Sequence, residues 1–211
     1  MAGWILGDRL VCHDVPVLVI VLLIPLAYML GTFPSALLIA RSRGIDIMES
    51  GSGNPGATNV SRMLGRRFGI LVFVLDGLKG AISAVVGYLI AGHGGGYALV
   101  AAAVLGHVFP VTRRFKGGKG VATAGGGMIA LYPPIGAVMA VLWFVVMKVS
   151  KKSSLGSLAI AVGFPTALII AGRPLSELLS GLGLCAFMVW RHWPNVQRLV
   201  RGTELSVTGK N

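Results

Sequence analysis

The stretch from Gly51 to Arg62, GSGNPGATNVSR, gathers small residues and neutral hydrogen-bond donors and ends in an arginine. Its glycines permit backbone conformations with positive φ, in which successive N–H groups can form a concave anion site. The guanidinium of Arg62 adds a fork of donors that suits phosphate. An ordinary turn between helices would explain one or two of these residues, but not so many donors together. We therefore predict an anion site with the candidates Ser52, Gly53, Asn54, Gly56, Thr58, Asn59 and Arg62.

A second polar stretch, Phe115 to Gly120, places two lysines among three glycines. It is not a Walker A loop, because that motif needs glycine at the position of Arg113 and serine or threonine at that of Gly120. It still offers flexible backbone donors, ammonium groups and the predicted start of a helix, whose N-terminal dipole favours an anion. Lys119 is the strongest ligand candidate. The further candidates are Lys116, Gly117, Gly118 and Gly120.

A third polar stretch, RHWPNVQRLVRGTE, runs from Arg191 to Glu204. Its residues His192, Asn195 and Arg198 recur every three positions, so they share one face of a short predicted amphipathic helix. His192 is the conventional candidate for a general base, although a substrate phosphate could serve equally well. A plain tail at a membrane interface would also explain Trp193 of this stretch and Trp190 just before it.

The composition indicates the solvent that surrounds these motifs. The chain has 211 residues, is 55% hydrophobic and only 12% charged, and its mean hydropathy is +0.80. Soluble domains carry about 25% charged residues, so an integral membrane protein is predicted. In a soluble chain the net charge of +12 would suggest nucleic acid as a partner, but basic cytoplasmic loops explain it and no nucleic acid is expected. Cys12 and Cys185 lack metal-site spacing and are expected to be inert thiols, and we expect no metal and no cofactor.

The apolar runs predict an all-α membrane protein with about seven transmembrane helices, each needing roughly 20 apolar residues, although some runs are shorter. The predicted spans are 15–40, 68–91, 97–111, the two halves of 120–147, 155–172 and 174–190. The segment 120–147 is divided at Tyr132-Pro133-Pro134, because prolines and a glycine triplet weaken a continuous helix. This division puts nearly all lysines and arginines on one face, which is then cytoplasmic. The N-terminus is predicted outside, and the C-terminus and all three polar stretches in the cytoplasm.

Residues 1–211 are expected to form one transmembrane domain, with an N-terminal extension at 1–14 that is not a removable signal peptide, and a tail at 205–211. Asp76 and Lys79 lie three residues apart inside a span, where single charges are costly, so we expect them to pair. His107 is expected to pack or to cap rather than to catalyse. Glu177 shows no partner close in sequence.

Taken together, these motifs make the chain resemble the bacterial integral-membrane glycerol-3-phosphate acyltransferases that take their acyl group from acyl phosphate. The similarity covers most of the chain and rests on GIDIMESGSGNPGATNVSRMLG, LDGLKG, GHVFPVTRRFKGGKGVAT and RHWPNVQRLVRGTE. The resemblance implies acyl transfer from acyl phosphate to the primary hydroxyl of sn-glycerol 3-phosphate. The products would be 1-acyl-glycerol 3-phosphate and phosphate, early in phospholipid synthesis. It also implies a multi-pass protein of the inner (plasma) membrane, in contact with membrane lipid, whose active site faces the cytoplasm.

The mechanism implied by this resemblance is direct attack of the acceptor hydroxyl on the acyl carbonyl, with positioning and charge stabilisation as the enzyme's main contributions. Ser52, Lys119, His192 and Asn195 are the predicted catalytic residues. A covalent acyl-enzyme on Ser52 is the less favoured route, since no Ser–His pairing is readable from the sequence. Acyltransferases that use thioesters commonly show His followed five positions later by Asp, and none of the four histidines here does.

Two other classes of function fit parts of the pattern. A transporter of a phosphorylated small molecule would also use basic, glycine-rich helix ends, but the sequence has no internal repeat and only Asp76 and Lys79 lie deep in a span. A non-catalytic scaffold that binds anionic lipid needs clustered lysines rather than Ser, Asn and Thr donors. A separate alternative for the second polar stretch is that Arg113, Arg114 and Lys116 only mark the inner leaflet of the membrane.

Overall fold

Every regular element in residues 7–208, the part of the chain that the computed structural model describes, is a helix. The elements are α1 (Gly7–Gly31), α2 (Ser35–Arg41), α3 (Ala57–Leu64), α4 (Arg66–Val108), a short 3-10 helix (Val111–Arg113), α5 (Val121–Leu131), α6 (Pro133–Ser150), α7 (Ser153–Ile170), α8 (Leu175–Arg191) and α9 (Trp193–Val200). Side chains are described from residue 15 onward. The predictions for the extension at 1–14 and for Cys12 therefore lie, in whole or in part, outside the described residues.

The first apolar run, predicted as one span, is interrupted between α1 and α2. The helix ends at Gly31 and a new one begins at Ser35, after Pro34, whose ring removes a backbone donor. Packing against α4 is close at this point, because a Cβ on Gly31 would overlap the carbonyl oxygen of Ala103. Small residues of this kind let membrane helices approach each other.

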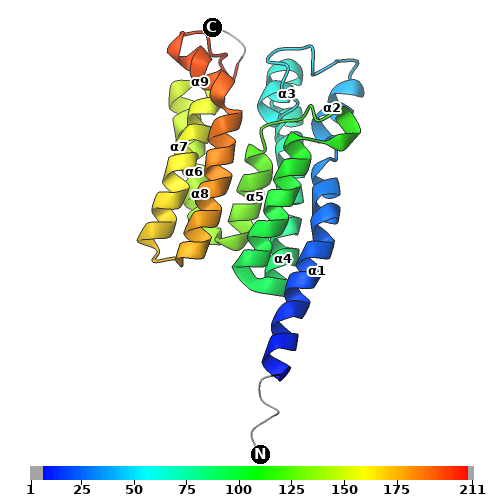
Figure 1. Cartoon of the computed structure of the whole chain (residues 1–211). Coiled ribbons are helices and arrows are strands. Elements are labelled where there is room, and N and C mark those ends of the chain that lie inside the picture. The colour runs from blue at the N-terminus through cyan, green and yellow to red at the C-terminus, as the bar shows by residue number, and fades with distance from the viewer. Residues whose placement is uncertain (1–6, 209–211) are drawn as a thin grey trace, which may run out of the picture.

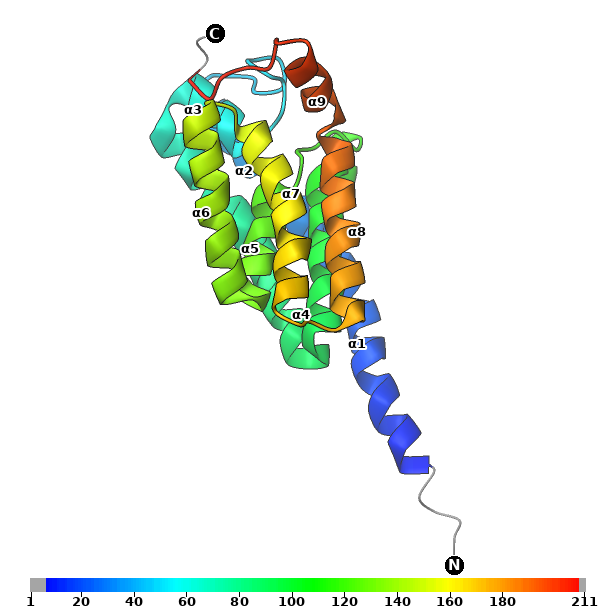
Figure 2. The same ribbon diagram turned by 90° about the vertical axis from the view of Figure 1, so that its left-hand side faces the viewer.

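The long element α4 contains a reversal of the chain. Ala91 (φ −142°) and Gly92 (φ +60°, ψ −155°) leave the helical conformation, and the positive φ suits glycine. The two halves pack closely, because a Cβ on Gly87 would overlap the carbonyl oxygen of Gly95, and the converse also holds. Figures 1 and 2 show the first half leading away from α3 and the second half returning toward it. The reversal falls between the predicted segments 68–91 and 97–111.

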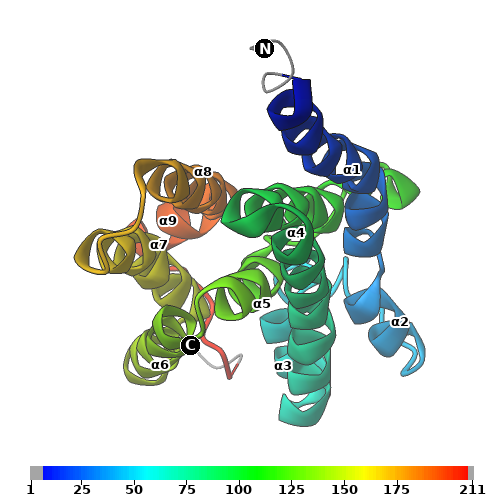
Figure 3. The same ribbon diagram turned by 90° about the horizontal axis from the view of Figure 1, so that it is seen from below.

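The predicted division of 120–147 is confirmed, since α5 ends at Leu131 and α6 begins at Pro133. Proline is well tolerated at the first position of a helix, because an N–H group there would have no hydrogen-bond partner within the helix. Seen along the bundle in Figure 3, α5 lies between α4 on one side and α6 and α7 on the other. The contact of α4 with α5 depends on Gly80, where a Cβ would overlap the carbonyl oxygen of Thr123.

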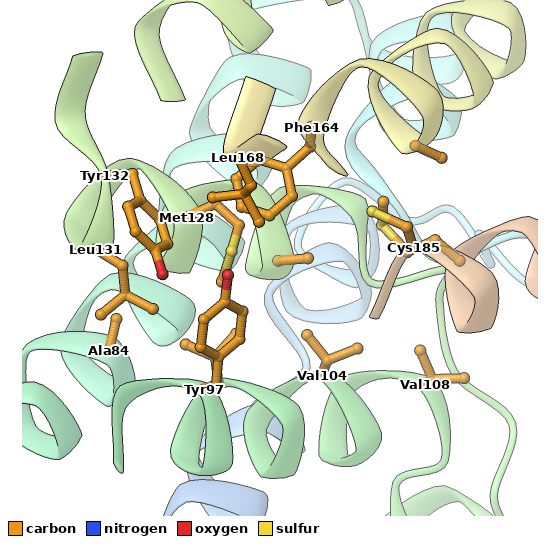
Figure 4. Close-up of a cluster of buried hydrophobic side chains, with 14 residues drawn as sticks. Ala84, Tyr97, Val104, Val108, Met128, Leu131, Tyr132, Phe164, Leu168 and Cys185 are labelled. Atoms are coloured by element: carbon orange, nitrogen blue, oxygen red, sulfur yellow. The ribbon is translucent and has the colours of Figure 1, made fainter. Parts of the chain in front are cut away.

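The largest buried apolar cluster joins the second half of α4 to α5, α7 and α8. Figure 4 shows Tyr97 and Val104 of α4, Met128 of α5, Phe164 of α7 and Cys185 of α8 in this cluster. The thiol of Cys185 is buried and free, as expected of an inert cysteine. The cluster holds the two sides of the bundle in fixed positions.

The outer surface of the bundle is apolar. Leu22, Leu89 and Ile170 are among many large hydrophobic side chains that are exposed, a surface that suits lipid rather than water. Four described segments are long and apolar enough to cross a membrane by length and composition, namely Val15–Arg41, Arg66–Arg113, Pro133–Ser150 and Ser153–Ile170. The protein is thus an all-helical integral membrane protein.

The end of the bundle near the start of α8 carries a polar cluster around Glu177, which we call the Glu177 cluster. We expected no partner close in sequence, and that prediction is wrong. Arg173, four residues earlier, donates Nε to Oε2 (2.8 Å) and Nη2 to Oε1 (3.0 Å). The hydroxyl of Tyr132 also donates to Oε2 (2.6 Å), and Nδ1 of His93 lies 3.5 Å from Oε1. The cluster ties α4, the α5–α6 junction and α8 together.

At the opposite end of the bundle, three connecting segments gather (Figure 1): the loop after α2, the loop after α4, and α9 with the chain that follows it. The predicted tail contributes here, since the backbone N–H of Val207 donates to the carbonyl oxygen of Lys151 (2.8 Å). Nε of Arg62 donates to the carbonyl oxygen of Ser206 (3.0 Å). The three polar stretches of the sequence are therefore brought to one end.

Candidate active site

The three polar stretches line one pocket, the polar pocket, with a cavity of about 120 Å³. The first stretch contributes Ser52, Asn54, Gly56, Thr58, Asn59 and Arg62, the second Lys119 and Gly120, and the third His192, Asn195, Arg198 and Glu204. Ten of the fourteen residues predicted for the site are thus brought together. Residues far apart in sequence meet here because the loops and α9 lie at one end of the bundle.

Within the first stretch, Asn59 shapes the loop. It is only 1% exposed. Its Oδ1 accepts from the backbone N–H of Ser52 (3.0 Å) and from Nη1 of Arg62 (3.2 Å), while Nδ2 donates to the carbonyl oxygen of Ser50 (2.9 Å). The side chains of Ser52, Asn54 and Thr58 make no such bonds among the described residues, so they face the pocket as free hydrogen-bonding groups. Asn59 thus holds the backbone of the loop and the guanidinium of Arg62 in place.

The second and third stretches are joined by a chain of polar contacts. Nζ of Lys119 donates to Oδ1 of Asn195, whose Nδ2 donates to Oε1 of Glu204 (2.6 Å). Nε of Arg198 donates to Oε2 of the same carboxylate (2.8 Å). The amide of Asn195 is therefore fixed in orientation, with its oxygen toward the lysine and its nitrogen toward the carboxylate.

Burial shifts the pKa values of the charged side chains in this series of polar contacts. It lowers the pKa of Lys119 to about 8, although the negative charge of Glu204 opposes the shift. Burial also acts to raise the pKa of Glu204, but the polar side chains of Asn195, Ser154 and Arg198 beside the carboxylate outweigh it and the pKa is lowered. A charged lysine near neutral pH can bind phosphate, and its weak hydration inside the pocket strengthens that contact.

His192 is held in one tautomer by the end of α8. Its Nδ1 lies 2.7 Å from the carbonyl oxygen of Met188, which can only accept, so Nδ1 carries the proton and Nε2 keeps a lone pair. The ring is 3% exposed and lines the pocket. Burial and then the charge of Lys119 lower the pKa of His192 to about 4. The imidazole is thus neutral at pH 7 and suited to accepting a hydrogen bond, although it is a weak base.

Four predicted residues do not line the pocket: Gly53, Lys116, Gly117 and Gly118. Lys116 is exposed to solvent. The backbone N–H of Gly118 donates to the carbonyl oxygen of His107 (3.1 Å), and a Cβ on Gly118 would overlap the ring of His107. The glycines at 117 and 118 therefore pack the loop against the end of α4, which holds the neighbouring Lys119 in place.

Sequence reasoning missed several residues of the pocket wall, namely Phe73, Asp76, His107, Trp143, Ser153, Ser154 and Ser157. Ser154 is 3% exposed, and its Oγ is buried without a hydrogen-bond partner among the described residues. The same side chain lies near the carboxylate of Glu204 and helps to lower its pKa, so Ser154 is a donor on the pocket wall that this carboxylate or a ligand can take. A signal was present, because the serines follow Lys151 and Lys152 in a loop that was predicted to lie on the same face as the three stretches.

An apolar groove of about 460 Å³ continues from the polar pocket. The two share Phe73, Val121, Ala122 and Trp143, and the groove runs between α4, α5, α6, α7 and α8. Its lining includes Gly125, where an added Cβ would meet nothing within 4 Å. A molecule with a charged head and a long apolar chain fits this combination.

Comparison with known proteins agrees with this geometry. A family model described as glycerol-3-phosphate acyltransferase matches residues 21–202. The glycerol-3-phosphate acyltransferase of Rubrobacter xylanophilus is 41% identical over 192 residues, covering 90% of this chain and 96% of the relative. That of Aquifex aeolicus is 38% identical over 184 residues, covering 86% and 96%.

Two solved structures have a similar fold. One is PlsY, an integral membrane glycerol 3-phosphate acyltransferase, in its glycerol 3-phosphate form, with a TM-score of 0.84 and 37% sequence identity. The alignment covers 89% of this chain and 94% of that chain. The lysophosphatidic acid form of the same protein gives a TM-score of 0.82.

Proposed function

The chain belongs to the glycerol-3-phosphate acyltransferase family, and we propose that it transfers the acyl group of an acyl phosphate to the primary hydroxyl of sn-glycerol 3-phosphate. The products are 1-acyl-glycerol 3-phosphate and phosphate, in an early step of phospholipid synthesis. The observation that carries this proposal is the continuity of the polar pocket with the apolar groove through Phe73 and Trp143. A transporter of a phosphorylated small molecule would need the pocket but not the groove.

Phosphate recognition is assigned to the charged and donor groups of the pocket. Lys119 and Arg62 supply positive charge, and the free side chains of Ser52, Thr58 and Ser154 supply neutral donors. The first turn of α3 and that of α5 add backbone N–H groups near Gly56 and Gly120. Both substrates carry phosphate, so a pocket with several donor groups on different walls suits the simultaneous binding of both.

The reaction we propose is direct attack of the primary hydroxyl on the acyl carbonyl, followed by departure of phosphate. Lys119 and Asn195 lie together beside the developing and departing negative charge, which they stabilise. His192 offers Nε2 to the attacking hydroxyl and orients it. Because its pKa is lowered to about 4, a phosphate oxygen of the substrate, with a second pKa near 6, is the stronger base and takes the proton.

We also propose the membrane topology. The helices α1, the two halves of α4, and α5 to α8 run alternately along the bundle, which supports seven crossings. With its 11 residues, α5 spans only about 16 Å of a hydrocarbon core of about 30 Å, so its crossing is completed by flanking chain. The basic loops at the pocket end place that end in the cytoplasm and the N-terminus outside the inner (plasma) membrane.

The test uses purified protein in detergent with acyl phosphate and glycerol 3-phosphate, and it follows both phosphate release and lysophosphatidic acid. Parallel reactions contain acyl-CoA as the donor or the variant Ser52→Ala. We expect product from acyl phosphate alone and its loss in the variant. Equal turnover of acyl-CoA would refute the donor, and no product from folded wild-type protein would refute the reaction.

A further inference from the structure

The wall of the polar pocket contains a carboxylate that the reaction above leaves unused. Asp76 lies in the first half of α4, is 1% exposed and lines the pocket. Its Oδ1 accepts from Oγ of Ser35 (2.5 Å) and from Nζ of Lys79 (2.5 Å), which confirms the predicted pairing. Lys79 also donates to the carbonyl oxygen of Phe33 (2.7 Å). One carboxylate oxygen is thus fully used in holding α4 to the start of α2.

The second oxygen, Oδ2, makes no hydrogen bond within the described part of the chain. A carboxylate oxygen that lines a pocket and accepts from no described protein donor is available to a donor brought by a ligand. That donor is not a phosphate, because a carboxylate repels the anionic part of either substrate. The hydroxyl groups of the glycerol substrate are the donors that remain.

Glycerol 3-phosphate carries two hydroxyl groups, and few strong acceptors in the described lining are free for them. Both oxygens of Glu204 are taken by Asn195 and Arg198. Nε2 of His107 abuts Gly118, and Nδ1 of the same ring lies 3.8 Å from Oδ1 of Asp76, so both ring nitrogens face protein groups. Among the carboxylates and imidazoles of the pocket this leaves Oδ2 of Asp76 and Nε2 of His192. Two free acceptors therefore face a substrate with two hydroxyls.

The two acceptors differ in charge and in their protein partners: Asp76 is paired with Lys79, whereas Nε2 of His192 is a neutral lone pair. Asp76 supplies the counter-charge of the buried ammonium group of Lys79, and it keeps that role when a ligand only donates a hydrogen bond to it. It suits a hydroxyl that keeps its proton throughout the reaction. The primary hydroxyl loses its proton during acyl transfer, whereas the secondary hydroxyl does not.

Resting on the proposed function, we propose that Asp76 accepts a hydrogen bond from the secondary hydroxyl of glycerol 3-phosphate, while His192 faces the primary hydroxyl. Asp76 is then the residue by which the enzyme distinguishes its acceptor from phosphomonoesters that lack the secondary hydroxyl. Lys79 and Ser35 are positioning residues, because they fix the carboxylate without touching substrate.

The test compares glycerol 3-phosphate with 3-hydroxypropyl phosphate, which keeps the primary hydroxyl and lacks the secondary one. In wild-type protein we expect kcat/KM to be about 100-fold lower for the analogue, because Oδ2 is left without a partner. The double variant Asp76→Leu/Lys79→Met removes both charges of the pair together, so no buried charge is left unpaired. Its discrimination between the two substrates should fall below about 10-fold.

Two further variants separate recognition from folding. Ser83→Ala is the matched control, because Ser83 is a 3% exposed residue of the same helix whose hydroxyl donates to the carbonyl oxygen of Lys79 (2.8 Å) but does not line the pocket. It should keep the wild-type discrimination. Asp76→Glu keeps the charge and its pairing while moving the free oxygen, and it should lower turnover of glycerol 3-phosphate more than that of the analogue.

Equal kcat/KM for the two substrates in wild-type protein would overturn the proposal without any variant. Wild-type discrimination that persists in Asp76→Glu and in the double variant would overturn it as well. Failure of the proposed function gives a different result, namely no turnover of glycerol 3-phosphate by wild-type protein with acyl phosphate.

Discussion

The two ends of the bundle each carry a polar cluster, and the clusters differ in how far their hydrogen bonds are satisfied. In the Glu177 cluster both carboxylate oxygens accept from Arg173, and Tyr132 adds a further donor. In the polar pocket the hydroxyls of Ser52, Thr58 and Ser154 have no partner among the described residues. A saturated cluster stabilises the contacts between helices, whereas an unsaturated one is completed by a ligand.

The largest loss of activity is expected when positive charge is removed from the polar pocket, since the Glu177 cluster should tolerate a charge change with little loss of activity. Lys119→Met should lower kcat/KM for glycerol 3-phosphate by about 1,000-fold, because the charge that stabilises the departing phosphate is lost. The unfolding temperature should be unchanged or higher, since a buried charge has been removed. Steady-state kinetics and a thermal melt in the same detergent check both. A loss of less than about 10-fold would contradict the assigned role.

The apolar groove offers a second test. Gly125→Leu should lower kcat/KM for a long-chain acyl phosphate by about 10- to 100-fold, because a Cβ at this position meets nothing within 4 Å and the new side chain occupies the groove. A short-chain acyl phosphate should be affected much less. Gly183→Leu is the matched control, since Gly183 is equally open but lies outside this groove. Equal effects of the two substitutions would argue against the groove as the acyl site.

The pH dependence of kcat/KM tests whether the reaction requires the positive charge of Lys119. Its lowered pKa of about 8 means that the positive charge is lost as the pH rises through 8, so kcat/KM should fall above that value. Lys119→Arg keeps its charge and should flatten the alkaline limb. Because the pKa of His192 is about 4, its protonation should cause no decline between about pH 5 and 7, and a decline in that range is assigned to the substrate phosphate, whose second pKa is near 6. An alkaline limb that is identical in Lys119→Arg would assign it to another group.

The smallest effect on activity is expected in the Glu177 cluster. Glu177→Gln removes the charge that pairs with Arg173, so the protein should lose about 1–3 kcal/mol of stability. Below its unfolding temperature, kcat/KM should stay within about 2-fold of wild type, because the cluster lies at the opposite end of the bundle from the pocket. A thermal melt and a kinetic assay on the same sample measure the two effects.

The sequence predicted those parts of the site whose functional residues lie close together in the chain. The donors of residues 52–62 and the 192–195–198 face can be read directly, and charge parity placed them at one end. Asp76 could not be assigned to the pocket, because only the packing of α4 beside the loops brings it there. The break before α2 was also missed, since Thr32 to Pro34 interrupts a run that hydropathy alone reads as continuous.

Other differences come from local interactions that were misjudged. Gly117 and Gly118 were predicted to cradle an anion, but the end of α4 lies so close that only glycine fits beside His107. The pair of Arg173 with Glu177 spans four residues, but Arg173 precedes α8, which begins at Leu175. It was missed because the pair joins the loop before the helix to the first turn of the helix, which helical periodicity does not predict.

The most direct test of the account is the binding of glycerol 3-phosphate alone, measured by calorimetric titration of the purified protein without an acyl donor. The account predicts one binding site per chain in wild-type protein, its loss in Lys119→Met and its retention in Glu177→Gln. Binding that survives in Lys119→Met, or that disappears from folded Glu177→Gln protein, would contradict the assignment of the unsaturated cluster as the ligand site.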